Sequence, residues 1–233
     1  IKDASGQIRV VTLDANLTGL EGGAAVVFAS GFLDPTANQN GSSFGVFAAL
    51  PDGAVVQLPE VTTARLQVVH NAADPAAFLV DVYLDGSLLL DNFVFRTATP
   101  FIDAPADQLI NIGVGTSLSG GVGDTLVNFP LTLIPGETYI AVANGVLDPS
   151  QFEANPDGRS TGFGLFINAM GQESASGSNT VDLSVLHGST DAPTVDVVAR
   201  NVATLVDDAA YGDFTPYFGV PAAAYVLDIT DAS

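Results

Sequence analysis

Two histidines in the chain are each followed by aspartates at nearly the same spacing, and these residues are the first candidates for chemistry. A histidine beside a carboxylate can act as a general acid or base, or can activate a serine nucleophile in a catalytic triad. No Gly-x-Ser-x-Gly elbow accompanies them, and a pattern that occurs twice more easily locks a turn through hydrogen bonds from the ring. We therefore predict no catalytic residue, no enzymatic activity and a structural role for all six residues. They are His70, Asp74 and Asp81 in the first copy and His187, Asp191 and Asp196 in the second.

Metal binding is the second kind of chemistry that the residue types allow. Two histidines without any cysteine and without a paired His-x3-His make a poor zinc site. Two loops rich in Asp, Asn and Gly offer the hard oxygen ligands that Ca²⁺ prefers. Neither loop has the EF-hand spacing, and the same residue types are common in ordinary turns, so calcium stands beside a purely structural interpretation. The candidate calcium ligands are Asp34, Asn38, Asn40, Asp148, Asn155 and Asp157.

Short apolar runs separated by turn residues must position these side chains. Residues 24–29 and 126–133 are such runs, Asp85-Gly86 is a hairpin signal, and a further strand is expected over residues 7–13. No segment shows a convincing helical period of apolar residues. Regular short strands with Gly, Pro and Asp turns predict an all-β fold made of Ig-like β-sandwich units in tandem.

An internal repeat organises the strands. Residues 65–86 return as residues 183–200, with His70 and His187 separated by 117 positions. Earlier segments also return, at shifts of 114 and 119 positions. They are residues 31–35 with 145–149 and residues 44–47 with 163–166.

The repeat divides the chain into one complete unit and two halves. Residues 63–182 form the complete sandwich unit, residues 1–62 supply the second half of a unit, and residues 183–233 supply the first half of another. A half sandwich exposes strand edges and an apolar face, so we expect both halves to be completed. The two ends can close within one chain, they can close between neighbouring chains, or the sequence can be a window of a longer array.

The first copy of the motif resembles a known family. Val68-Val-His-x3-Asp-Pro75, followed by Val80-Asp-Val-Tyr-x-Asp-Gly86, is similar to the repeat of domain-of-unknown-function family number 4397. The second copy departs from that pattern at Val198 and at Arg200-Asn201. The resemblance implies a β-sandwich repeat of secreted and cell-surface proteins of bacteria and archaea, with a structural or adhesive role and no catalytic residues to carry over.

Composition narrows the classes of partner. Asp and Glu number 26 against 6 Lys and Arg, a net charge of -20 that repels nucleic acid and anionic membranes. No run of 18 apolar residues is present, so we expect no membrane insertion. An acidic surface suits high salt, divalent cations or life outside the cell, where solubility matters most. The family resemblance implies the last of these, and we expect a secreted or cell-surface protein.

These observations predict a non-enzymatic structural subunit of an extracellular or cell-surface assembly, a filament or stalk. Its partners would be copies of itself joined head to tail by strand completion. The alternative is a ligand-binding or adhesive module for glycans or for calcium-dependent contacts. A third interpretation is an accessory domain of a secreted hydrolase whose catalytic part lies elsewhere.

Overall fold

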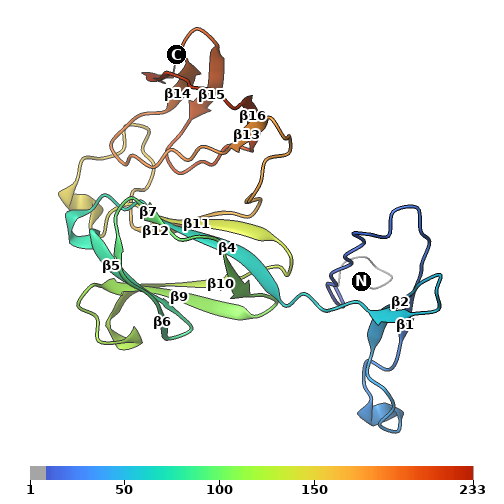
Figure 1. Cartoon of the computed structure of the whole chain (residues 1–233). Helices are drawn as coiled ribbons and strands as arrows, with labels where there is room; N and C mark the ends of the chain where they lie inside the picture. Colours follow the sequence, from blue (N-terminus) through green and yellow to red (C-terminus); the bar gives the residue numbers. More distant parts are fainter. Residues whose placement is uncertain (1–8, 233) are drawn as a thin grey trace. The chain divides into compact units, whose positions relative to one another are not determined.

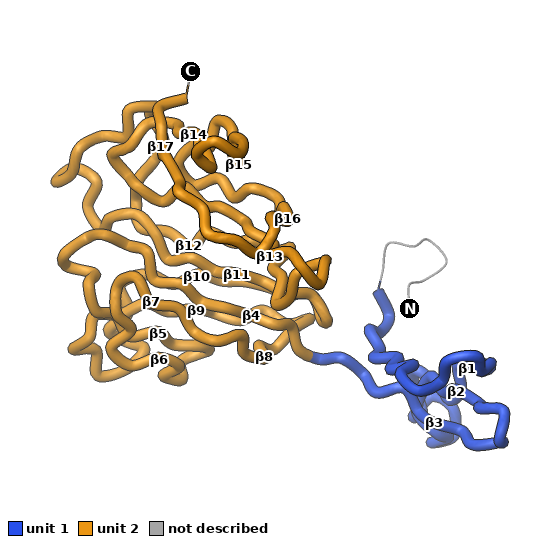
Figure 2. The backbone as a smooth tube through the Cα atoms, turned by 45° about the horizontal axis from the view of Figure 1, so that its top comes forward, with its two compact units in different colours: residues 1–62 blue, residues 63–233 orange. Residues whose placement is uncertain are grey.

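The computed structural model describes residues 9–232 of the chain. Apart from short 3₁₀ turns, every regular element among them is a β-strand, which confirms the predicted all-β fold. The chain separates into two compact units, residues 1–62 and residues 63–233, which are described one at a time (Figure 2). This division does not test how the half units predicted at the two ends of the chain are completed. Their completion stays a prediction.

Unit 1 is built on an antiparallel sheet of three strands in the order β1-β2-β3. Its elements are β1 (Val26–Ser30), the 3₁₀ turn η1 (Thr36–Asn38), β2 (Gly45–Ala49) and β3 (Val55–Gln57). β2 is largely buried, whereas every residue of β1 is exposed. Four of the five residues of β1 are valine, phenylalanine or alanine, so its exposure leaves an apolar strand uncovered within unit 1.

Unit 2 begins with two sheets that pack face to face (Figure 1). The strand order is β10-β9-β5-β6 in the first sheet and β12-β11-β4-β7 in the second, where β8 also pairs with β4. The first sheet contains β5 (Leu79–Leu84), β6 (Ser87–Val94), β9 (Leu109–Thr116) and β10 (Thr125–Thr132). The second contains β4 (Thr63–His70), β7 (Thr97–Ala98), β8 (Ile102–Pro105), β11 (Thr138–Asn144) and β12 (Gly164–Asn168). The 3₁₀ turns η2 (Pro75–Ala77), η3 (Val122–Asp124) and η4 (Pro149–Gln151) lie in the connections.

Alternating residues of β4 form the centre of the core. Every second side chain of β4 is buried, as expected for a strand with one face toward a second sheet. Leu66 packs in one cluster with Ile110 from the opposite sheet and with Ala141 from the adjacent strand β11. The cluster therefore joins both layers into a sandwich, while an Ig-like topology stays a prediction.

The Asp85-Gly86 turn between β5 and β6 forms as predicted. The φ angles are 47° at Asp85 and 83° at Gly86, the two positive values that a type I′ hairpin turn requires.

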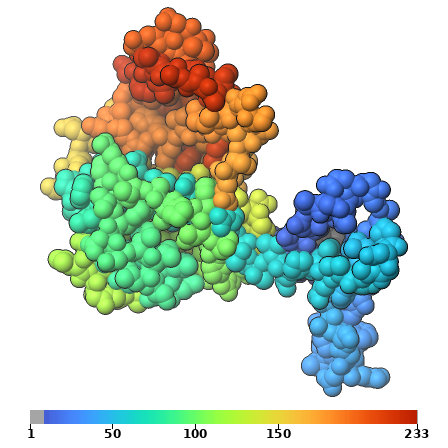
Figure 3. All heavy atoms as spheres, in the orientation of Figure 1, coloured from blue at the N-terminus to red at the C-terminus, as the bar shows by residue number. Residues whose placement is uncertain are grey.

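The carboxy-terminal segment, residues 180–232, adds two small sheets to unit 2. The strand orders are β13-β16 and β15-β14-β17. Their bounds are β13 (Thr180–Leu183), β14 (Val195–Ala199), β15 (Ala203–Ala209), β16 (Phe218–Pro221) and β17 (Leu227–Asp231). In the space-filling view this segment, coloured orange to red, lies directly on the complete unit (Figure 3).

The strand predicted over residues 7–13 is wrong for the residues that the structure describes. Residues 7 and 8 lie outside the described range, and residues 9–13 contain no strand, although Leu13 makes an isolated bridge to Glu60. The repeat places residues 11–18 at the position of β10, which in unit 2 pairs with β9. The described part of unit 1 contains no equivalent of β9, and the bonds of residues 12–14 go to residues 59–61, where they form a single bridge and no ladder.

No helix in the described part of the chain is long and apolar enough to cross a membrane.

Candidate assembly surfaces

Both histidines hold turns through the same pair of hydrogen bonds. His70 Nε2 lies 2.7 Å from the carbonyl oxygen of Ala77, and His70 Nδ1 accepts from the backbone N–H of Ala72 at 3.4 Å. His187 Nε2 lies 2.9 Å from the carbonyl oxygen of Pro193 and accepts at Nδ1 from the backbone N–H of Ser189 at 3.3 Å. This arrangement requires a neutral ring that donates from Nε2. The ring nitrogens are thereby occupied by backbone groups.

Burial lowers the pKa of His70 below its ordinary value, and the hydrogen bond to Ala77 opposes this shift only in part. The unfolded chain therefore binds a proton at a higher pH than the folded chain does. We expect the free energy of unfolding to be greatest above the ordinary histidine pKa of about 6.5 and to fall as the pH drops from there through the folded pKa. Urea unfolding at pH 7.5 and pH 5.0 measures the difference. His70→Gln should lose less stability over that interval than the parent chain, and an equal loss would contradict the assignment.

The aspartates of the first motif copy bind backbone groups of their own unit. Asp74 is 5% exposed, and its carboxylate accepts from the backbone N–H groups of Ala76 and Leu147, each at 2.8 Å. Asp81 is 2% exposed and accepts from the backbone N–H of Asn92 at 2.9 Å and from Ser119 Oγ at 2.5 Å. A buried carboxylate with two donors on it is a fixed structural group.

The aspartates of the second copy are only partly engaged. Asp196 accepts from the backbone N–H of Asp208 at 2.9 Å, as Asp81 does from Asn92. Asp191 is exposed and has Ser189 Oγ at 3.3 Å. The motif thus recurs in three dimensions, but the carboxylates of the second copy bind fewer backbone groups than those of the first.

The predicted calcium ligands have hydrogen-bond partners in their own loops or in the carboxy-terminal segment. Asp34 accepts from Thr36 Oγ1 at 2.6 Å, and Asp148 accepts from Ser150 Oγ at 2.6 Å, which lowers the pKa of each carboxyl group. Asn38 Nδ2 donates to the backbone carbonyl of Asp34 at 2.9 Å. Asn40 lies in the left-handed region with φ 56°, at the turn that follows η1. Calcium binding by these loops stays a prediction.

Three other carboxylates form the described group whose ligand atoms lie within 4.8 Å of one another. They are Asp196, Asp207 and Asp208, on β14 and β15. None of them was predicted as a ligand. The group is largely exposed, and Asp196 already binds the backbone N–H of Asp208.

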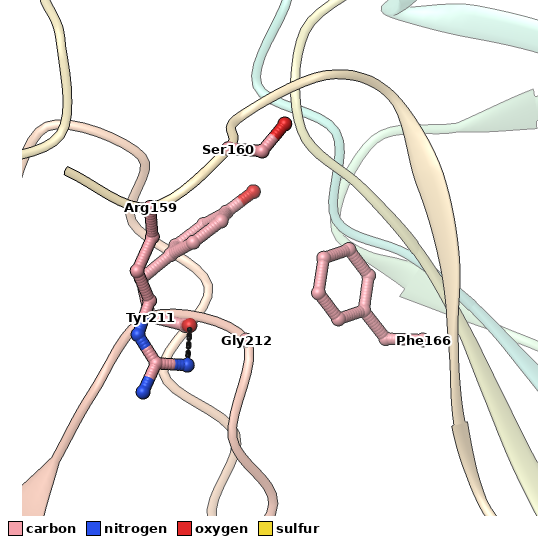
Figure 4. Close-up of a pocket in the computed structure, with 5 residues that line it drawn as sticks. All are labelled: Arg159, Ser160, Phe166, Tyr211 and Gly212. Carbon is pink, nitrogen blue, oxygen red and sulfur yellow. Dashed lines mark hydrogen bonds between the residues drawn. The ribbon is translucent and has the colours of Figure 1, made fainter.

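A loop of the complete unit, residues 153–161, holds the carboxy-terminal segment in place (Figure 4). Arg159 makes a bidentate ion pair with Asp213 at 2.8 and 2.9 Å and donates to the carbonyl of Tyr211 at 2.9 Å. Phe166 packs edge to face on the Tyr211 ring, with centroids 6.0 Å apart. A hollow of about 400 Å³ is lined by Arg159, Phe166, Tyr211, Ser160 and Gly212.

The same loop uses two of the predicted calcium ligands. Asn155 Nδ2 donates to the carbonyls of Thr190 and Ala192 at 3.1 and 3.2 Å, and the Asp157 carboxylate accepts from the backbone N–H of Thr194 at 2.7 Å. The carboxy-terminal segment is therefore held by several bonds from the complete unit, and its open surfaces are preformed.

Unit 1 reproduces part of the complete unit in register. β1 pairs Val26 with Ala49, and β11 pairs Ile140 with Asn168, so the two hairpins are related by shifts of 114 and 119 positions. An isolated bridge beyond each hairpin obeys the same shifts. The bridges are Phe32 with Ser43 and Val146 with Gly162. β1 and β2 are thus the equivalents of β11 and β12.

The carboxy-terminal segment reproduces the other part. β13 and β16 pair Thr180 with Pro221 as β4 and β8 pair Thr63 with Pro105. β14 and β17 likewise repeat the pairing of β5 and β9. β4 has β11 on its other edge and β9 has β10, but the corresponding edges of β13 and β17 carry no strand in the described part of the chain. The equivalents of the missing strands are in residues 11–49.

An apolar hollow of about 430 Å³ lies beside β1 in unit 1, and we name it the amino-terminal groove. Val27, on its wall, is 60% exposed, whereas Ala141, its equivalent 114 positions later, is fully buried. Ala25 likewise corresponds to Tyr139, a core residue that is 5% exposed. The lining residues are Leu17, Leu20, Glu21, Gly23, Ala24, Ala25, Val27, Leu50 and Pro51.

A second apolar hollow, of about 470 Å³, lies on the carboxy-terminal segment, and we name it the carboxy-terminal groove. Its lining residues are Val181, Leu183, Val220, Pro221, Ala222, Ala223 and Tyr225. By the paired registers, five of these correspond to core residues of the complete unit that are at most 9% exposed. Those core residues are Ala64, Leu66, Ala104, Ala106 and Ile110. Each groove is therefore lined by one part of a sandwich core.

The groove residues are apolar, so the polar motifs of the sequence do not mark them. The signal was nonetheless present, since each groove residue is an apolar position whose repeat partner falls in an alternating apolar strand.

Comparison with known proteins adds one finding to this geometry. No curated protein and no solved structure matches the chain. One family model matches, and its match lies on the carboxy-terminal segment, which holds the second copy of the motif. The relation of residues 63–182 to that family rests on the internal repeat. Residues 181–233 match the model of the family described as Domain of unknown function (DUF4397).

Proposed function

We propose that the chain is a non-enzymatic structural subunit of an extracellular or cell-surface assembly, a filament or stalk. Sandwich units would be completed by strand addition, with residues 11–49 supplying the strands that the carboxy-terminal segment leaves open. Strand addition gains affinity from main-chain hydrogen bonds and from a shared apolar core.

One observation carries the proposal, namely that the two grooves are lined by equivalents of residues that meet in one core. Tyr139 and Ala141 contact the cluster of Leu66 and Ile110 in the complete unit. Their equivalents, Ala25 and Val27, face an open hollow in unit 1. Joining the grooves would remove both apolar surfaces from water, at about 25 cal/mol per Å² of apolar area.

The acidic composition supports the extracellular setting. A net charge of -20 keeps single subunits soluble and weakens binding to nucleic acid. The strands on the grooves are largely apolar and uncharged, so this repulsion acts mainly outside the surfaces that would join.

Light scattering on the purified full chain over a dilution series tests the proposal. We expect species at multiples of 23.8 kDa that dissociate on dilution, because association depends on concentration. A monomer at every concentration would contradict assembly between chains. Repeating the series with a calcium chelator tests the acidic loops, since dissolution by the chelator would assign them a role in the contact.

A further inference from the structure

We propose that β13 of one copy receives β1 of a second copy as its parallel neighbour. In this register Val26 lies opposite Ser184 and Phe28 lies opposite Leu186, and the acceptor's Asp191 carboxylate binds the donor's Leu33 backbone N–H. This inference rests on the proposed function and adds the partner, the strand direction and the register.

The register follows from the pairing inside the complete unit. β11 runs parallel to β4, with Ile140 opposite Gln67 and Val142 opposite Val69. Residues of β1 lie 114 positions before their equivalents in β11. Residues of β13, and the residues that follow it, lie 117 positions after their equivalents in β4. One further bridge agrees, because Leu186 pairs with Phe214 as Val69 pairs with Ala98.

The open edge of β1 has the groups that such a ladder needs. Ala143, on β11, accepts from the backbone N–H of Asn71 at 2.8 Å. Its equivalent is Ala29, which lies opposite Val46 in the ladder of β1 and β2. The Val46 carbonyl accepts from the backbone N–H of Leu58 on the β3 side, so Val46 and Ala29 form a pair without hydrogen bonds between them. Backbone groups of successive strand residues point to opposite edges, so Ala29 presents its N–H and carbonyl to the edge away from β2.

Asp191 has the position of a carboxylate that already makes this contact in the complete unit. Asp74, its equivalent, binds the backbone N–H of Leu147 at 2.8 Å. Leu147 lies two residues after Gly145, and Leu33 lies two residues after Gly31, in the same Gly-x-Leu-Asp-Pro sequence. The two glycines have φ values of 92° and 85°, so both loops leave their strands in the same conformation. Asp191 is exposed and can therefore receive the Leu33 N–H.

The length of the connection between the units favours a second copy as the donor. The backbone N–H of Val61 binds the carbonyl of Thr12 at 2.9 Å, and the carbonyl of Thr63 accepts from the backbone N–H of Gly136 at 2.9 Å. Only Thr62 lies between these two anchored residues, so a donor strand from the same chain is tethered by a single residue, whereas a second copy carries no such tether. A contact between different surfaces of two copies propagates into a filament or closes into a ring.

Engineered cysteines test the register, because the chain has no cysteine of its own. The full chain carrying Val26→Cys with Ser184→Cys is oxidised and analysed by non-reducing gel and intact mass. We expect a ladder of disulfide-linked chains. The control is Val26→Cys with Leu186→Cys, which moves the second cysteine two residues along the same face, about 6.6 Å. We expect at least about ten-fold less linkage in the control.

Each result has a distinct meaning when light scattering is run on the same samples. Equal linkage in both pairs would overturn the register, and linkage within single chains would overturn the second-copy donor. Assemblies that scatter light without forming the ladder would contradict this inference alone, whereas monomers throughout would contradict the proposed function as well. Adding Asp191→Ala to the first pair should raise the concentration needed for half-maximal linkage about ten-fold. The control Asp207→Ala makes the same change of charge and should leave the concentration for half-maximal linkage unchanged. Equal effects of the two substitutions would overturn the Asp191 contact.

Discussion

Replacing Val27 with aspartate is expected to abolish self-association of the chain while both units stay folded. Val27 is 60% exposed in unit 1, so the substitution leaves the isolated subunit nearly unchanged. In the proposed assembly its side chain takes the place of Ala141, which is fully buried in the complete unit. An unpaired carboxylate at such a site costs several kcal/mol, and about 3 kcal/mol already weakens association more than about 100-fold.

Sedimentation velocity at matched concentrations of the parent chain and Val27→Asp measures this effect. Val202→Asp is the control. Val202 is 67% exposed in the turn between β14 and β15, so this substitution adds the same charge away from both grooves. We expect the control to assemble like the parent. Equal dissociation of both variants would attribute the effect to net charge and contradict the role of the amino-terminal groove.

Leu66→Ala is expected to lower the free energy of unfolding of unit 2 by about 2–5 kcal/mol, because it empties a core site that is 1% exposed. Leu183, its equivalent 117 positions later, is only partly buried and lines the carboxy-terminal groove. In the dilute monomer, Leu183→Ala should therefore cost about 1 kcal/mol or less. The two substitutions therefore make the same chemical change at equivalent positions of the repeat, one in a filled core and one in an open groove.

Urea unfolding of the dilute full chain, followed by circular dichroism, measures both losses. The comparison is then repeated at concentrations where the parent assembles, and there the cost of Leu183→Ala should approach that of Leu66→Ala. Equal costs in the dilute monomer would mean that the carboxy-terminal groove is already filled within one chain, and strand completion between chains would be wrong.

The sequence predicted the fold class, the hairpin at Asp85-Gly86 and most strand positions, because each depends on neighbours within a few residues. The repeat shifts of 114, 117 and 119 positions also came from the sequence, and the pairing registers agree with them. Residues 7–13 show where this approach fails. Their alternating pattern is that of a strand, but a ladder needs a partner, and no equivalent of β9 lies in the described part of unit 1.

The polar candidates show a second limit. Sequence alone could not tell that Asn155 and Asp157 hold residues 190–194, because loops of the same composition also serve as turns and as metal sites. The structural role predicted for His70 agrees with its bonds to Ala72 and Ala77, two groups close in sequence. The bond from Leu147 to Asp74 spans 73 positions, and only the folded unit reveals it.

The sequence by itself determined that this chain is all-β, and its repeat predicts one complete unit between two halves, since periodicity and repetition are properties of residue order. The tertiary structure decided which apolar residues are covered. Leu66 and Leu183 have the same type and the same position in the repeat, yet the first is buried and the second lines an open groove. The physical reason is that burial depends on strands that pack from distant parts of the chain. β4 has such strands on both sides, whereas β13 has one on one side only among residues 9–232.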